Sequence, residues 1–400
     1  MTRVVEALTE RLPGRLDRAF RAGANALLPP QHWHIPLTIL EGVAATSGPP
    51  VRVLVAGPEP AARYWIGRCL AKVSLRKSLA PCALFRLRAE LVRRRAAVDL
   101  TLVCLDRASA RWFAGDDYLM VPEWIGMRAP TPDLRALGRR SGRVAGDLLR
   151  VRNGRFTWRL AQSRQAFDAF YASMYLPYVH ARHGELAHAH SRARLASAWR
   201  HGVLLGVERD GELVAGQLLE REGDVLHLVA LGVRDGDEEL LKAGASAALY
   251  VFAIEYATRE GCRFLDFRGT RASLADGVLR YKRKWGAGVS VRGDVRHATW
   301  MHWHGLSDAT VAWLVAAAPV FQVGTELYGL VVADRNAPPR RETLVKMRDD
   351  WAVPGLAALC VLASANDAHA IPGIHVVPCH ASRPCNPAMV HASVAARSGG

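Results

Sequence analysis

The chain has 400 residues, more than one domain usually holds, so two domains are expected. Half of the residues are hydrophobic and 22% are charged, a globular composition that excludes global disorder. Lys and Arg outnumber Asp and Glu by 53 to 37, giving a net charge of +16. This charge indicates attraction to phosphate-rich partners or anionic lipid, although a compositional bias toward arginine explains it equally well.

The chain begins with MTRVVEALTERLPGRLDRAF, which carries charges throughout and lacks the apolar core of a secretory signal. A cytoplasmic location is therefore expected. The segments 51–56 and 98–105 are predicted to be buried strands, and the segments 61–72 and 84–95 are predicted to be helices. The single glycine of AGPEP after the first strand does not match a dinucleotide-binding loop.

An aromatic stripe at helical spacing follows, and core packing is the favoured role for it over a ligand groove. Its members are Phe167, Phe170, Tyr171, Met174, Tyr175 and Tyr178. The histidines at 180, 183, 188 and 190 come next, but acidic and cysteine partners are missing near them. No metal site is predicted.

Two strands within 203–220 are joined through Asp210-Gly211, a dipeptide favoured in tight hairpins. The segment 225–233 is predicted to be a third strand. A helix is predicted from Gly244 to Glu260, ending at Gly261. Further predicted elements are a strand at 264–267, a short helix at 278–285, and strands at 289–292 and 298–303.

The segment 311–332 is apolar and long enough to span a bilayer. Pro319, Gln322 and Glu326 argue against a span, because an intramembrane glutamate is costly. A core or membrane-surface helix is expected instead. From 336 onward the sequence lacks sustained periodicity and is rich in Pro, Ser, Ala and His, which predicts a mostly disordered tail.

The stretch DGVLRYKRKWG contains two of the chain's few lysines. On a helix, Val278, Tyr281, Lys282 and Trp285 occupy one face, so Lys282 shares a face with apolar residues. A lysine in such a place either extends its ammonium group to water or is held near an anion, where its charge becomes usable.

The order of elements resembles the GNAT acyltransferase fold, an α/β (α+β) fold. The pair LDFRG (265–269) and YKRKWG (281–286) resembles the Phe-Lys-x-x-Trp-Gly region of FemAB-type transferases and their BioF2-like relatives, with Tyr281 in place of phenylalanine. FemAB-type proteins carry two GNAT-like domains in tandem. The expected organisation is therefore a degenerate GNAT-like domain at 1–155, an acyltransferase domain at 156–335 and a flexible tail at 336–400.

This resemblance implies transfer of an acyl group to an amine, with Lys282 stabilising the oxyanion of the tetrahedral intermediate. Asp266 is the expected second catalytic residue, and Asp276, Glu255 and His227 remain alternatives as general base. The expected substrate-binding residues are Tyr178, His183, Arg268, Tyr281 and Trp285. Simple packing is an equal alternative for Tyr281 and Trp285.

GNAT enzymes hold the pyrophosphate of coenzyme A on an Arg/Gln-x-x-Gly-x-Gly/Ala loop at a helix N-terminus. The corresponding segment, LKAGAS (241–246), lacks the leading Arg or Gln. Lys242, Gly244 and Ser246 are the expected donor-binding residues, and acetyl-CoA or another acyl-CoA is the expected donor. Aminoacyl-tRNA is the alternative donor, because it needs this loop less and suits the positive charge.

The function expected from the sequence is N-acyl transfer to an amine of a sugar, a cell-envelope precursor or a small metabolite. The alternative is a basic protein that binds RNA or a membrane surface and has a degenerate GNAT site.

Overall fold

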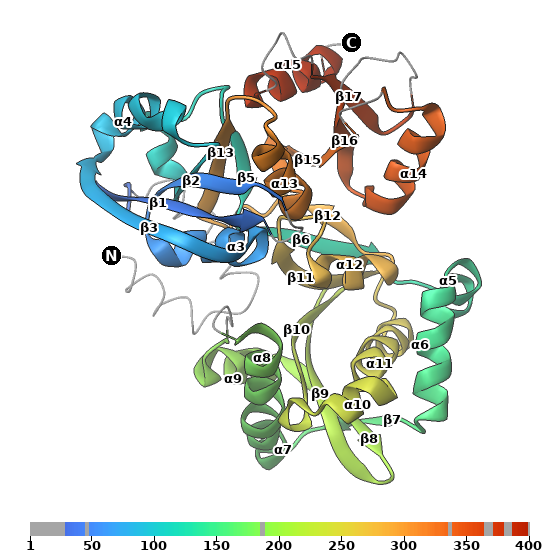
Figure 1. The fold of residues 1–400 in the computed structure, drawn as a ribbon. Helices are drawn as coiled ribbons and strands as arrows, with labels where there is room; N and C mark the ends of the chain where they lie inside the picture. Colours follow the sequence, from blue (N-terminus) through green and yellow to red (C-terminus); the bar gives the residue numbers. More distant parts are fainter. Residues whose placement is uncertain are drawn as a thin grey trace. The chain divides into compact units, whose positions relative to one another are not determined.

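The computed structural model describes residues 29–44, 48–184, 189–334, 338–363, 371–379 and 386–398 (Figure 1). It contains two compact units. Among the described residues, the first unit comprises those within 126–269 and 281–288, and the second comprises those within 29–125, 270–280 and 289–398. The expected domain boundary at 155 lies within the first unit and does not separate the two.

A seven-stranded sheet organises the first unit, in the order β12-β6-β11-β10-β9-β8-β7. These strands are β6 (Trp124–Pro130), β7 (Thr157–Ala161), β8 (Gly202–Arg209), β9 (Glu212–Glu222), β10 (Val225–Val233), β11 (Phe264–Arg271) and β12 (Gly288–Ser290). The predicted hairpin is confirmed, and Asp210 and Gly211 at its turn have φ of 53° and 82°. This left-handed pair matches the twist of the flanking strands.

The helices of this unit include α5 (Leu134–Arg140), α6 (Gly142–Asn153), α7 (Arg164–Ala169), α8 (Leu176–His183), α9 (Arg192–Arg200), α10 (Glu238–Ala243) and α11 (Ala245–Arg259). A π-helix, Phe170–Tyr175, joins α7 to α8. Figure 1 shows α6 beside α11. Helix α12 (Gly277–Lys284) ends in the first unit.

The aromatic stripe is a core stripe, as predicted. Phe167, Phe170 and Met174 are buried against Leu204 and Leu218 of the sheet. The contact between the π-helix and β10 is especially close at Gly232, where a Cβ atom would lie 2.5 Å from the backbone of Met174. Glycine is therefore required there to let the two backbones approach.

The second unit contains a six-stranded sheet in the order β3-β1-β2-β4-β13-β5. Its strands are β1 (His34–Ala44), β2 (Pro50–Ala56), β3 (Leu70–Ala83), β4 (Leu100–Asp106), β5 (Leu119–Pro122) and β13 (His297–Trp303). The predictions of β2, β4 and β13 as strands are confirmed, while β1 and β3 were not predicted. β13 was expected in the later domain, but it lies between β4 and β5.

Helices of this unit near the same sheet are α3 (Glu59–Cys69) and α4 (Leu87–Arg94). Three short 3-10 helices, η1 (Leu84–Arg86), η2 (Arg95–Ala97) and η3 (Arg107–Trp112), connect the strands. Leu54, Val103 and Trp300 belong to the core beneath them.

The apolar segment 311–332 is not one helix. It forms the end of α13 (Asp308–Ala317) and then a hairpin of β14 (Val320–Val323) and β15 (Glu326–Val332). The left-handed backbone of Ala318, followed by Pro319, ends the helix, and Gly324 with φ of 56° turns the chain. Among the described residues, no helix is long and apolar enough to cross a membrane.

The expected disorder of 336–400 is corrected over the described parts of that segment. These contain α14 (Arg341–Trp351), β16 (Leu356–Ala363), β17 (Ile374–Pro378) and α15 (Pro387–Ser398). β16 pairs in parallel with β15 and β17, and this pairing buries the apolar run that ends β16. Such a short apolar run carries no helical or alternating pattern, which is why its order was not predicted.

Candidate functional site

Strands β10 and β11 of the first unit are paired only at their beginnings. Their parallel register runs from Val225↔Phe264 to His227↔Asp266 and ends there, although β10 continues to Val233 and β11 to Arg271. A register shift against β9 between Leu228 and Ala230 adds a bulge to β10, and bulges bend strands. The two strands therefore part immediately beyond His227 and Asp266.

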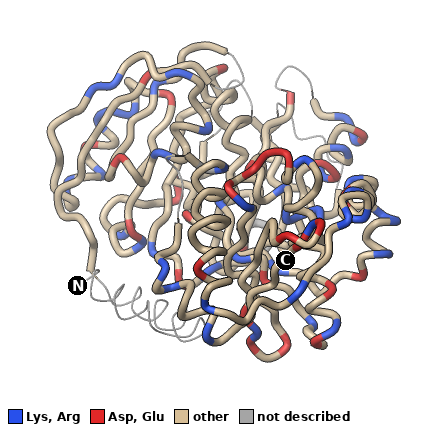
Figure 2. Tube along the Cα trace, turned by 90° about the horizontal axis from the view of Figure 1, so that it is seen from below, with Lys and Arg blue, Asp and Glu red and all other residues tan. Residues whose placement is uncertain are grey.

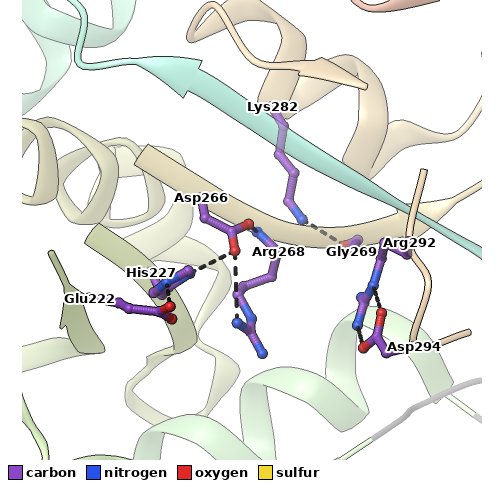
Figure 3. Close-up of polar contacts among 8 residues, drawn as sticks. All are labelled: Glu222, His227, Asp266, Arg268, Gly269, Lys282, Arg292 and Asp294. Atoms are coloured by element: carbon purple, nitrogen blue, oxygen red, sulfur yellow. Dashed lines mark hydrogen bonds and ion pairs between the residues drawn. The ribbon is translucent and has the colours of Figure 1, made fainter. Parts of the chain in front are cut away.

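A His–Asp pair lies at this parting point. His227 Nδ1 is 2.7 Å from Asp266 Oδ2, and the imidazole is almost fully buried. On its other side, His227 Nε2 is 3.3 Å from Glu222 Oε2. Figure 3 shows His227 between the two carboxylates. The carboxylate of Asp266 fixes the imidazole orientation, as such partners do in acid–base sites.

Asp266 also shapes the backbone of its own strand. Its Oδ1 accepts the backbone N–H of Arg268 at 2.7 Å, and Arg268 has φ of 62°. A left-handed arginine inside a strand is uncommon, and such strained residues concentrate at functional sites. Burial raises the pKa of Asp266, but the hydrogen bond from His227 and the charge of Arg268 outweigh it and hold the pKa well below its usual range.

The two sequence motifs meet through Lys282. Its Nζ donates a hydrogen bond to the carbonyl oxygen of Gly269 at 2.8 Å, and the residue is only 6% exposed (Figure 3). Gly269 follows the left-handed Arg268 directly, so the strained turn of β11 presents this carbonyl. The prediction that Lys282 faces inward from its helix is confirmed.

The rest of the predicted helix face is partly wrong. Val278 is 38% exposed, whereas Leu279 is buried together with Lys282 and Trp285. The turn before the helix determines which side chains face inward. Asp276 Oδ1 accepts the backbone N–H groups of Val278 and Leu279 at 2.9 and 3.2 Å and so fixes the start of the helix. Asp276, an alternative for the general base, therefore caps α12.

Aromatic rings bring three of the predicted site residues together. The ring of Tyr250 stacks on Trp285 at 5.8 Å and meets Tyr281 edge-on at 5.1 Å. The hydroxyl of Ser246 lies 3.5 Å from that of Tyr281, and burial raises the pKa of Tyr281 to about 12. Trp285 is fully buried, which is consistent with packing, and its substrate-binding role stays a prediction.

Lys284, the second lysine of the motif, has a partner that sequence reasoning missed. It forms an ion pair with Asp147 of α6, a carboxylate that is itself buried and also pairs with Arg150. The ammonium of Lys284 is 3.8 Å from the ring centroid of Tyr281. Asp147 lies 137 residues earlier in a helix, with no local signal to mark it.

The expected donor-binding segment is a kinked pair of helices rather than an open loop. Gly244, with φ of 110°, joins α10 to α11. Asp237 accepts the backbone N–H groups of Glu239 and Leu240, so its carboxylate already caps α10. Lys242 is exposed and pairs with Glu239 at 2.7 Å. The donor roles of Lys242, Gly244 and Ser246 stay predictions.

The two remaining predicted residues lie on α8. Tyr178 is half-buried and lies near Tyr250 and Tyr281, and burial is the main cause that raises the pKa of those two residues. His183 ends α8, and its side chain lies outside the described residues.

Comparison with protein families decides what this arrangement is. Residues 138–283 match the model described as "Acetyltransferase (GNAT) domain". These residues form a GNAT acyltransferase domain. The match includes the parting strands, the His–Asp pair and Lys282, and it stops one residue before Lys284. No curated protein matches the chain.

Solved structures similar to the chain share little sequence with it. FemX is 12% identical with a TM-score of 0.36, over 75% of this chain and 95% of FemX. L-PGS from Bacillus licheniformis is 12% identical with a TM-score of 0.32, over 78% and 95%. A GCN5-related N-acetyltransferase from Sphaerobacter thermophilus is 14% identical with a TM-score of 0.29, over 62% and 72%.

Proposed function

We propose that this GNAT domain transfers an acyl group from an activated donor to an amine, with Lys282 and His227 as its catalytic residues. The observation that carries the proposal is the bond from Lys282 Nζ to the Gly269 carbonyl, which fixes a buried ammonium beside the end of β11. A fixed cation in a site with little water stabilises a developing oxyanion far better than water does.

In the proposed reaction, the nitrogen lone pair of the acceptor amine attacks the carbonyl carbon of the acyl donor. The acyl oxygen gains negative charge and is stabilised by the ammonium of Lys282. His227 takes the proton lost by the amine, and the Asp266 and Glu222 carboxylates on its two sides stabilise the resulting imidazolium. The bond between the acyl carbon and the donor then breaks, and the leaving group departs with its electron pair and takes up the proton held by His227, which restores the neutral imidazole.

Asp266 acts here as a positioning residue. Its lowered pKa keeps it ionised at neutral pH, so it accepts hydrogen bonds from His227 and from the Arg268 backbone at the same time. Its two oxygens thus tie the base to the turn that presents the Gly269 carbonyl. One carboxylate sets the positions of both the proposed base and the proposed oxyanion cation.

Acetyl-CoA or another acyl-CoA is the donor class we propose, because GNAT domains generally use acyl-CoA. Aminoacyl-tRNA is the alternative donor. The proposed acceptor is an amine of a sugar, a cell-envelope precursor or a small metabolite, and the proposed location is the cytoplasm. Lys242, Gly244 and Ser246 remain the proposed contacts for the donor. Calorimetric titration of the full chain with acetyl-CoA and with charged tRNA separates the two donors.

The test of the catalytic proposal is Lys282→Met, compared with Arg280→Met as a matched control. Both substitutions remove a cation from α12, but Arg280 is exposed. Lys282→Met should retain donor binding and lose at least about a hundredfold in acyl transfer, whereas Arg280→Met should retain activity. Equal activities of the two variants, both folded by thermal unfolding, would place the chemistry elsewhere.

A further inference from the structure

Three large aromatic side chains are exposed together in the second unit. Trp33 is 50% exposed, Phe85 is 62% exposed and Trp112 is 36% exposed. Soluble proteins seldom leave such residues grouped at the surface without a use for them. These three residues, with Arg86 and Arg111, are called the aromatic patch below.

Strand pairing brings two of the aromatic residues together. β1 begins at His34 opposite Ala83, the last residue of β3, and the backbone N–H of Leu84 donates to the Trp33 carbonyl at 2.8 Å. Trp33 directly precedes β1 and Phe85 lies two residues after β3, so both residues lie beside the same paired strand ends. Trp112, at the end of η3, meets Trp33 edge-on with ring centroids 6.3 Å apart.

The segments that carry the patch are tied to the fold. Asp106, which is fully buried, accepts the backbone N–H of Gln31 at 2.9 Å and that of Ser109 at 3.2 Å. A single carboxylate thus connects the segment before Trp33 to the start of η3. The backbone segments that carry Trp33 and Trp112 are consequently held in place, which lowers the entropic cost of binding through them.

Each arginine of the patch covers the face of an aromatic ring. The guanidinium of Arg111 is 5.6 Å from the Trp112 ring centroid, and that of Arg86 is 5.8 Å from the Phe85 centroid. These guanidinium groups reduce the ring area of Phe85 and Trp112 that is open to stacked nucleic-acid bases. The exposed aromatic side chains thus lie beside positive charge.

We propose that the aromatic patch docks the protein on an anionic phospholipid bilayer. Tryptophan favours the boundary between headgroups and acyl chains, and arginine beside it pairs with lipid phosphate. The net charge of +16, spread along the chain in Figure 2, adds long-range attraction to such a surface. This docking surface is separate from the acyl-transfer proposal and does not depend on it.

The test is co-sedimentation of the full chain with vesicles, either of phosphatidylcholine alone or with about a quarter phosphatidylglycerol. We expect binding to the anionic vesicles only. Replacing Trp33, Phe85 and Trp112 together by Ala should reduce the partition coefficient at least about tenfold, and Arg111→Gln should reduce it about fivefold. The matched control is Leu149→Ser with Val315→Ser, which removes two exposed apolar side chains outside the patch and should bind as the wild type does.

Three outcomes would overturn the proposal. They are equal binding to neutral and anionic vesicles, unchanged binding of the triple variant, and a wild-type dimer in solution that the triple variant loses. If the triple variant does not fold, Phe85→Ser alone tests the most exposed residue and should still lower vesicle binding. Acyl transfer between dissolved substrates should be unchanged in Phe85→Ser, which keeps failure of docking distinct from failure of the catalytic proposal.

Discussion

At the scale of single residues, Lys282 and Lys284 differ sharply although they are only two positions apart. Lys282 binds a backbone carbonyl, whereas Lys284 neutralises the buried carboxylate of Asp147 and lies over Tyr281. Helical periodicity was enough to predict that Lys282 faces inward. It gave no sign of Asp147, because partners distant in sequence are fixed only by the packing of α6 against α12.

Lys284→Met should therefore lower the free energy of unfolding and leave the rate of acyl transfer by the folded protein largely unchanged. Removing this lysine leaves the Asp147 carboxylate buried with only the more exposed Arg150, and a partly unpaired buried charge costs about 2 kcal/mol or more. Urea unfolding should show this loss, and Arg280→Met should show almost none. A double-mutant cycle with Asp147→Asn isolates the pair. A coupling near zero would contradict the ion pair.

Asp266 gives a prediction about pH. Its pKa is lower in the folded protein than in the unfolded chain, where a free aspartate titrates near 3.9. Its stabilising effect is therefore complete above about pH 5 and is lost as the pH falls through the unfolded value toward the folded one. The difference in unfolding free energy between wild type and Asp266→Asn should be largest near neutrality and shrink toward pH 3. A difference that is constant over this range would contradict the assignment.

At the scale of elements, the parting of β10 and β11 and the π-helix against β10 are the features that set the site. The sequence was sufficient to predict β8, β9, β10, β11 and α11, because their alternation, turn dipeptide and helix stop are local signals. It was insufficient to predict where β10 and β11 stop pairing. The end of their pairing depends on the bulge beyond Leu228, and no residue type in that segment predicts a bulge.

Gly232→Ala tests the close contact of the π-helix with β10. The new methyl group would lie 2.5 Å from the Met174 carbonyl carbon, a backbone atom that cannot move aside alone. A loss of about 1–3 kcal/mol of stability is expected from such overpacking. The control is Gly277→Ala, because no atom lies within 4 Å of its added carbon. Equal thermal unfolding midpoints for the two variants would show that the π-helix moves away from β10 at little cost in stability.

At the scale of the whole molecule, two properties have consequences: the net charge, and the way in which strands from distant parts of the sequence join one sheet. The α/β character of both halves was predictable, but the division into units was not. β13 enters the sheet beside β4 almost 200 residues after it, and β6 joins the sheet of the later strands. Pairings between distant segments leave no periodic pattern in the sequence, so the sequence favours contiguous domains, whereas each compact unit combines distant segments.

The charge of +16 predicts a non-specific affinity for RNA that Lys282→Met leaves intact. Binding that neutralises several phosphates should weaken steeply with salt, with a log–log slope near −0.7 for each contacted phosphate of a single strand. Filter binding of a single-stranded RNA between about 0.05 and 0.2 M salt measures this slope. Tight binding at about 0.2 M salt, without transfer from any acyl donor, would favour an RNA-binding protein over an enzyme.

The position of β13 between β4 and β5 also constrains synthesis. A ribosome releases β4 and β5 long before residues 297–303 emerge, so the edges of those two strands wait unpaired for the strand that joins them. Exposed strand edges recruit other chains. A fragment that stops at residue 155 keeps both edges and never receives β13. A fragment of the second unit therefore needs the chain through β13 to close this sheet, and the edge of β4 that pairs with β13 favours aggregation until that strand arrives.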